Sequence, residues 1–204
     1  VVTETTRPVG KLSGPALKGD GADRWLGGPL GYIIADSQLA GTRSLGAEMA
    51  FTNPFGIRTS LTPASDGTIT FGQLYAAQPF NNDLVVQTMT GAQIKAVIEQ
   101  GLDDEFTKQA LAPSANLQYS FDLRRPSGDR VVRISIDGHA IVPTRSYRVA
   151  TNSFLSEGGD NFTVFAQGSD KVRSGLDIDA MEAWLRAVPL RVIPMERRIV
   201  EIRG

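Results

Sequence analysis

The segment with the most chemical potential runs from Asn152 to Phe162 and contains two adjacent glycines followed by an aspartate. Glycine has no Cβ, so this backbone can turn sharply and approach a ligand closely. Asp160 would then present a carboxylate that accepts hydrogen bonds from hydroxyl groups. Phe154, just beyond an expected strand, would present the face of its ring. The plainer alternative is a surface turn at Gly158, Gly159 and Asp160, with Phe154 packed in the core.

A second segment, Gln78-Pro79-Phe80-Asn81-Asn82, places an aromatic residue beside two amides. The ring of Phe80 has the shape to stack on a planar ligand, and Asn82 carries both a donor and an acceptor for the edge of that ligand. Stacking on one aromatic side chain contributes roughly 1–3 kcal/mol per base, and two rings can hold a base from both faces. The alternative is that Phe80 anchors a buried loop.

A third segment runs from Asn53 to Arg58 and combines an amide, a glycine and an arginine. A guanidinium group forms paired hydrogen bonds with phosphate oxygens, so Arg58 is a candidate for contact with a phosphate or a ribose. Arg24 is a further candidate, although a single arginine in a polar segment is usually solvated.

The composition excludes several kinds of catalytic centre. The 204 residues include no Cys and one His, with a formal net charge of −1. Disulfides, thiolate metal sites and Cys nucleophiles are therefore excluded, and His139 alone cannot build a His-rich metal centre. His139 follows an Asp-Gly turn and is expected at the surface. The near-zero charge argues against a general nucleic-acid or anionic-membrane surface, and no stretch approaches the ~18 apolar residues of a membrane span.

The patterns predict an α+β fold, with one domain in which a mixed sheet packs against helices. Helices are expected from Pro29, over 71–77 and after Thr90, because Pro suits a first helical turn and Thr70 and Thr90 begin capping-box patterns. A last helix is expected to be capped by Asp177 or Asp179. Strands are expected over the ranges 9–12, 84–89, 117–123, 131–136, 146–151 and 198–202, and a hairpin turn at 137–138.

Together, the three polar segments resemble the C-terminal domain of the 5'-nucleotidase and UDP-sugar hydrolase type of secreted and periplasmic metallophosphoesterases. The resemblance rests on the order of three motifs: Asn-x4-Arg at 53–58, Gln-Pro-Phe-x-Asn at 78–82, and Asn-x-Phe-x3-Gly-Gly-Asp-x-Phe at 152–162. It extends from Arg7 to the end of the chain.

The resemblance implies a division of labour between two domains. An N-terminal metallophosphatase domain of the same polypeptide, absent from this chain, would hold two divalent metals and hydrolyse the phosphoester. The present domain would bind the nucleoside part of a nucleotide and swing toward the metals. By this resemblance, Phe80 and Phe154 would sandwich the base, and Asn53 and Asn82 would contact the base or its surroundings. Asp160 would bind the ribose hydroxyls, with Gly158 and Gly159 shaping its turn, and Arg58 and Arg24 would reach ribose or phosphate oxygens.

The same resemblance implies no catalytic residue, metal or cofactor in this chain, so we expect the isolated chain to be inactive. It also implies a secreted, periplasmic or cell-surface location. The chain starts at Val1 rather than Met, and we expect that it was excised from a longer polypeptide. The alternatives are a stand-alone nucleoside-binding module and a surface-interaction module without catalysis.

Overall fold

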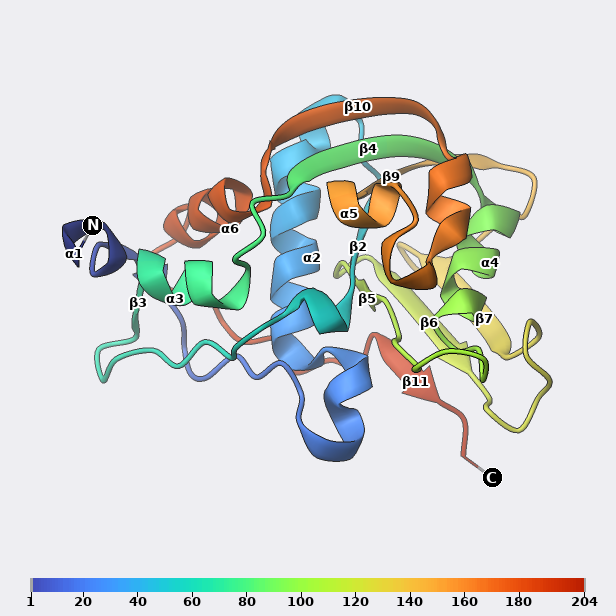
Figure 1. Ribbon diagram of the computed structural model, residues 1–204, viewed down its shortest axis with the longest axis horizontal. Coiled ribbons are helices and arrows are strands. Elements are labelled where there is room, and N and C mark those ends of the chain that lie inside the picture. The colour runs from blue at the N-terminus through green and yellow to red at the C-terminus, as the bar shows by residue number, and fades with distance from the viewer. Residues whose placement is uncertain (1, 204) are drawn as a thin grey trace.

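A central helix, α2 (Gly28–Thr42), organises the computed structural model, which describes residues 2–203. Figure 1 shows α1, α3 and α6 on one side of α2, and α4 with a four-stranded sheet on the other. Because α2 contacts α6 as well as β2, β5 and β9, it is buried on more than one face. Two of its buried polar side chains bond within the helix: the Ser37 hydroxyl donates to the Ile34 carbonyl at 2.8 Å, and the Thr42 hydroxyl donates to the Gln38 carbonyl at 2.7 Å.

The strands form mixed sheets, which confirms the predicted fold class. The five-stranded sheet has the order β10 (Ser169–Leu176), β4 (Asp83–Thr90), β9 (Ser146–Asn152), β2 (Met49–Thr52) and β5 (Ala112–Pro113). In it only β2 and β9 run parallel. The four-stranded sheet has the order β11 (Ile199–Glu201), β6 (Leu117–Phe121), β7 (Val131–Ile136) and β8 (His139–Ala140), and β1 (Pro8–Lys11) pairs with β3 (Thr68–Thr70).

The other helices join these sheets. The α-helices besides α2 are α1 (Val2–Thr5), α3 (Phe71–Ala77), α4 (Gly91–Gln100), α5 (Ser153–Ser156) and α6 (Asp177–Arg186). Short 3-10 turns are η1 (Gly21–Leu26), η2 (Arg43–Leu45), η3 (Pro54–Gly56), η4 (Gly159–Asn161) and η5 (Thr163–Gln167).

Two apolar cores hold the elements together. The larger core joins β2, α4 and the four-stranded sheet through buried residues such as Phe51, Val97 and Tyr119. The second core joins β1, α2, α3 and α6, with Ile33 and Met181 among its members. The start of α6 is therefore fixed against α2, next to the end of the five-stranded sheet.

The predictions that depend on residues close together in the sequence are confirmed. Helix α3 begins after Thr70 and α4 after Thr90, and both have the predicted capping box. The turn between β7 and β8 has positive φ angles of 49° at Asp137 and 79° at Gly138, as a tight hairpin requires. His139 is exposed, as predicted.

The predicted cap of the last helix is wrong. The N-cap position of α6 is Leu176, with no side-chain hydrogen bond, and Asp177 is the first helical residue. The reason is that β10 continues to Leu176 and leads directly into α6, which turns Asp177 inward. The sequence also gave no sign of β10, whose residues are mostly exposed at the edge of the sheet.

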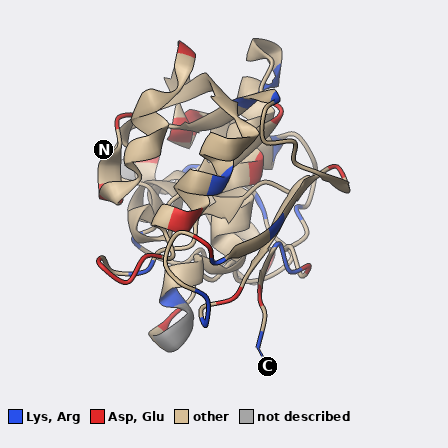
Figure 2. Cartoon of the chain, turned by 90° about the vertical axis from the view of Figure 1, so that its right-hand side faces the viewer, with Lys and Arg blue, Asp and Glu red and all other residues tan. Residues whose placement is uncertain are grey.

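Charged residues are interspersed over the face seen in Figure 2.

Arg198 differs from the charged residues at the surface because its side chain is 2% exposed. It lies just before β11, which begins one residue later than predicted, and binds both carboxylate oxygens of Asp36 at 2.8 and 2.9 Å. Its guanidinium group also lies 4.7 Å from the ring centre of Tyr32. Tyr32 is half-buried and packs against the larger core.

Candidate ligand-binding site

The candidate site is a pocket of about 410 Å³ at one edge of the five-stranded sheet. The strands β2, β9 and β10 end here. β4 runs antiparallel to its neighbours β9 and β10, so β4 begins at the same place. Each strand therefore delivers one loop to the same place. The lining residues are Ile34, Thr52, Asn53, Phe55, Gly56, Ile57, Arg58, Gln78, Phe80, Asn82, Asn152, Phe154, Asp160 and Asp177.

Asp160 is held in an unusual backbone conformation by two amides. Its φ angle is 53°, in the left-handed region, and Gly158, two residues earlier in the same loop, has a φ of 90°. The Asp160 Oδ2 atom accepts hydrogen bonds from Asn53 Nδ2 at 2.8 Å and from Gln109 Nε2 at 3.0 Å. Non-glycine residues in this region cost free energy and are found preferentially at functional sites. The fold thus fixes one carboxylate at the pocket.

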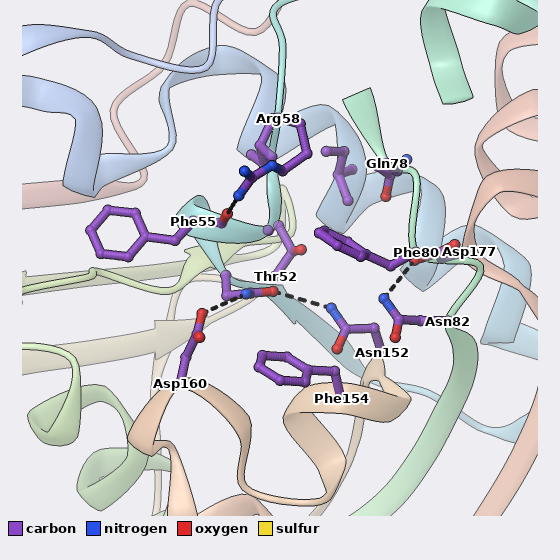
Figure 3. A pocket seen from close by; sticks show the side chains of 14 residues that line it. Thr52, Phe55, Arg58, Gln78, Phe80, Asn82, Asn152, Phe154, Asp160 and Asp177 are labelled. Carbon is purple, nitrogen blue, oxygen red and sulfur yellow. Dashed lines mark hydrogen bonds between the residues drawn. The ribbon is translucent and has the colours of Figure 1, made fainter. Parts of the chain in front are cut away.

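A chain of amides connects this carboxylate to the strand ends (Figure 3). Asn152 Nδ2 donates to Asn53 Oδ1 at 3.2 Å, while Asn152 Oδ1 accepts from the backbone of Leu155 at 2.8 Å and caps α5. Asn53 and Asn152 are both almost fully buried. In this arrangement the Asn53 amide lines the pocket and donates to Asp160, and its implied contact with the base or its surroundings stays a prediction.

Two aromatic rings in the pocket are solvent-accessible: Phe80 is 56% exposed and Phe154 is 44% exposed. Figure 3 shows them on either side of a gap, with Asp160 toward one end and Asn82 toward the other. A Cβ on Gly159 would lie 2.5 Å from the Phe154 ring, so the glycine provides the space that the ring occupies. The guanidinium of Arg58 lies 5.9 Å from the ring centre of Phe80.

The structure brings most of the predicted site residues together. Six of them line this pocket: Asn53, Arg58, Phe80, Asn82, Phe154 and Asp160. Gly158 and Gly159 belong to the loop that carries Asp160. Arg24 is not a lining residue; its guanidinium lies 5.4 Å from the ring centre of Phe55, which does line the pocket.

Sequence reasoning missed two polar residues of the site, Gln109 and Asp177. Gln109 is buried; its Oε1 accepts from the Phe55 backbone at 2.8 Å, and its amide donates to Asp160. It thus links the 53–58 loop to the Asp160 loop. No sequence pattern marks Gln109, whereas Asn152 stood in a motif already singled out.

Asp177 is the more unusual of the two, because it is 3% exposed and incompletely bonded. Its Oδ2 accepts from Asn82 Nδ2 at 3.5 Å, while its Oδ1 accepts no hydrogen bond from the residues that the structure describes. Burial raises the pKa of this carboxyl from 3.8 to about 6, against the opposing effect of hydrogen bonds from the Ile178 backbone and Asn82.

The side chains that line the pocket can stack on a planar group, accept hydrogen bonds and contact an anion through Arg58. Within residues 2–203, no three His, Asp or Glu side chains are arranged to hold a metal ion. Among the same residues, none of the helices has the length and apolar character needed to cross a bilayer.

The fold is a mixed α+β domain with a pocket lined by two accessible aromatic rings and a fixed carboxylate. Residues 8–167 match the family model described as the 5'-nucleotidase C-terminal domain. The chain belongs to this family.

Relatives and solved structures agree with this assignment. The chain is 37% identical over 182 residues to the trifunctional nucleotide phosphoesterase protein YfkN of Bacillus subtilis, covering 85% of this chain and 12% of that protein. It is 34% identical over 151 residues to the cell wall protein Lmo0130 of Listeria monocytogenes, covering 69% and 19%. The 5'-nucleotidase precursor of Thermus thermophilus superposes with a TM-score of 0.89 at 30% identity, covering all of this chain and 41% of that one. The chain thus spans less than half the length of each of these proteins.

Proposed function

We propose that this chain is the nucleoside-binding domain of a nucleotide-hydrolysing enzyme of the 5'-nucleotidase type. The observation that carries the proposal is the convergence of Phe80, from one segment of the chain, with Phe154 and Asp160, from another, on one pocket. Two accessible rings are suited to hold a base by stacking on both faces. A fixed carboxylate at one end is suited to accept hydrogen bonds from ribose hydroxyls.

The remaining lining residues have roles consistent with such a ligand. Arg58 is exposed beside Phe80 and would contact ribose or phosphate oxygens. Asn82 lies at the end of the gap remote from Asp160, where the edge of a base would be placed (Figure 3). Asn53 would support Asp160, and Arg24 would act indirectly by supporting Phe55.

Hydrolysis would be performed by another part of the polypeptide. We assign it to an N-terminal metallophosphatase domain that would hold two divalent metals, and these metals would supply an activated water as the nucleophile for the phosphoester. The substrate-binding domain would deliver the nucleotide to these metals by a hinge motion. We therefore expect the purified 204-residue chain to bind nucleosides without hydrolysing nucleotides. A secreted, periplasmic or cell-surface location fits this function.

The test is a calorimetric titration of the chain with adenosine, AMP, UMP and UDP-glucose, with thermal unfolding in parallel. A ligand that binds only the folded state raises its stability by mass action. We expect binding by the wild-type chain and its loss in Phe154→Ala and Asp160→Ala. If no nucleoside or nucleotide binds at millimolar concentration, the proposal fails, and the alternative of a surface-interaction module takes its place. Binding by a full-length protein that carries no metal centre would instead favour a stand-alone nucleoside-binding module.

A further inference from the structure

The end of the pocket remote from Asp160 is formed by Gln78, Asn82 and Asp177. Each amide nitrogen at this end donates one hydrogen bond: Gln78 Nε2 to the sulfur of Met181 at 2.9 Å, and Asn82 Nδ2 to Asp177. The buried atom at this end that has no hydrogen-bond partner among the described residues is an acceptor, the Oδ1 atom of Asp177.

The carboxyl of Asp177 is costly to bury without further hydrogen bonds. A buried charged group that lacks partners costs more free energy than a neutral one. Asp177 is 3% exposed, has one long hydrogen bond of 3.5 Å to a side chain, and has a second oxygen without a partner among the described residues. The terminal torsion of an aspartate is broad, so either oxygen can turn toward the pocket. A ligand that brings a donor to this end would supply the missing bond.

We propose that Asp177 is a specificity-determining residue, which accepts a hydrogen bond from an amino group on the edge of the bound base. This inference rests on the proposed function. When the ribose is at Asp160 and the base lies between the two rings, the far edge of the base faces Asn82 and Asp177 (Figure 3). The site then favours a base with an amino group on this edge, since an oxo group would place one acceptor against another.

The ionisation state of Asp177 supports its role as a hydrogen-bond acceptor. With a pKa of about 6, the carboxyl is ionised at pH 7.5 and can only accept hydrogen bonds. Hydrogen bonds to charged groups contribute about 1.5–3 kcal/mol, which corresponds to at least a tenfold difference in affinity.

The experiment compares pairs of nucleosides in which the amino group is exchanged for an oxo group and the neighbouring ring nitrogen gains a proton: adenosine with inosine, and cytidine with uridine. Calorimetry of the 204-residue chain at pH 7.5 should show that it binds the amino member of a pair at least about tenfold more tightly. In Asp177→Leu, which keeps the side-chain size and removes the acceptor, the preference should fall below threefold. Asp177→Asn keeps the shape and should reduce the preference at least threefold, and it provides the readout if Asp177→Leu does not fold.

Two controls separate this inference from the proposed function. Asp179→Asn removes the same charge from an exposed position on the same helix and should leave the preference unchanged. Phe154→Ala should weaken both members of a pair alike, because stacking does not depend on the edge of the base. Equal wild-type affinities, a preference that Asp177→Leu retains, or a preference for the oxo member would each overturn the inference and leave the proposed function standing. Absence of binding by every nucleoside would overturn both.

Discussion

Replacing Asp177 with Asn should stabilise the protein at neutral pH. In the native state, burial raises the pKa of Asp177 from 3.8 to about 6, so the folded protein binds this proton more tightly than the unfolded chain does. Stability contributed by the bound proton is present below pH 3.8 and is lost as the pH rises through 6. Ionised Asp177 therefore destabilises the fold by about 3 kcal/mol at pH 7.5.

The amide isostere removes this penalty but also the favourable interaction of a negative charge with the first turn of α6, which contributes up to about 1 kcal/mol. We expect a net gain of about 2 kcal/mol at pH 7.5, which corresponds to about 4–8 °C in Tm for a domain of this size. Urea denaturation of the wild type and Asp177→Asn measures the difference, and it should shrink toward zero at pH 4, where wild-type Asp177 is protonated.

The matched control is Asp179→Asn, which also removes a charge from the first turn of α6 but is exposed. It should destabilise slightly at both pH values. If Asp177→Asn is no more stable than the wild type at pH 7.5, or keeps its advantage undiminished at pH 4, then Asp177 is not a buried, ionised and poorly bonded carboxyl.

Three further variants test the pocket and its support. Gly159→Ala should displace the Phe154 ring, which a new Cβ would approach to 2.5 Å, and weaken adenosine binding about tenfold by calorimetry; unchanged affinity would show that the ring does not stack on the base. Gln109→Ala removes a hydrogen-bond donor to Asp160 and should lower the free energy of unfolding by about 1–3 kcal/mol. It should also weaken the binding of ribonucleosides, and it should weaken the binding of 2',3'-dideoxynucleosides less. An equal loss for both ligands would argue against hydroxyl recognition. Asp36→Asn removes the bidentate carboxylate from buried Arg198, which keeps Glu196 as a charged partner, and should lower stability by about 1–3 kcal/mol in urea denaturation, whereas unchanged stability would contradict this role.

The elements predicted correctly are those encoded by neighbouring residues. The capping boxes at Thr70 and Thr90 depend on a residue three positions later, so the sequence itself contains both partners. The same holds for the turn at Asp137, where two residues determine the backbone. β10 has no such signal, because an edge strand with exposed charges lacks the apolar alternation of a half-buried strand.

The site was predictable to the extent that its residues stand in short motifs. Phe80, Phe154 and Asp160 belong to such motifs, and the structure places them in one pocket. Gln109 and Asp177 act through partners far away in the chain, Asp160 and Asn82, so no local pattern distinguishes them from surface residues. The failed capping prediction for Asp177 has the same origin, because its burial is decided by the docking of α6.

The meeting of four strand ends at one edge of the sheet has a consequence for the order of folding. β2 pairs with β9 through Met49 and Val149, which are separated by about half of the chain, and contacts of this kind form slowly because a long loop must close first. The last wall of the pocket, at Asp177, depends on β10 and α6 near the C-terminus. A nascent chain is therefore unable to bind ligand until it is almost complete. Ligand affinity can accordingly serve as a reporter that distinguishes the finished topology from partly folded intermediates.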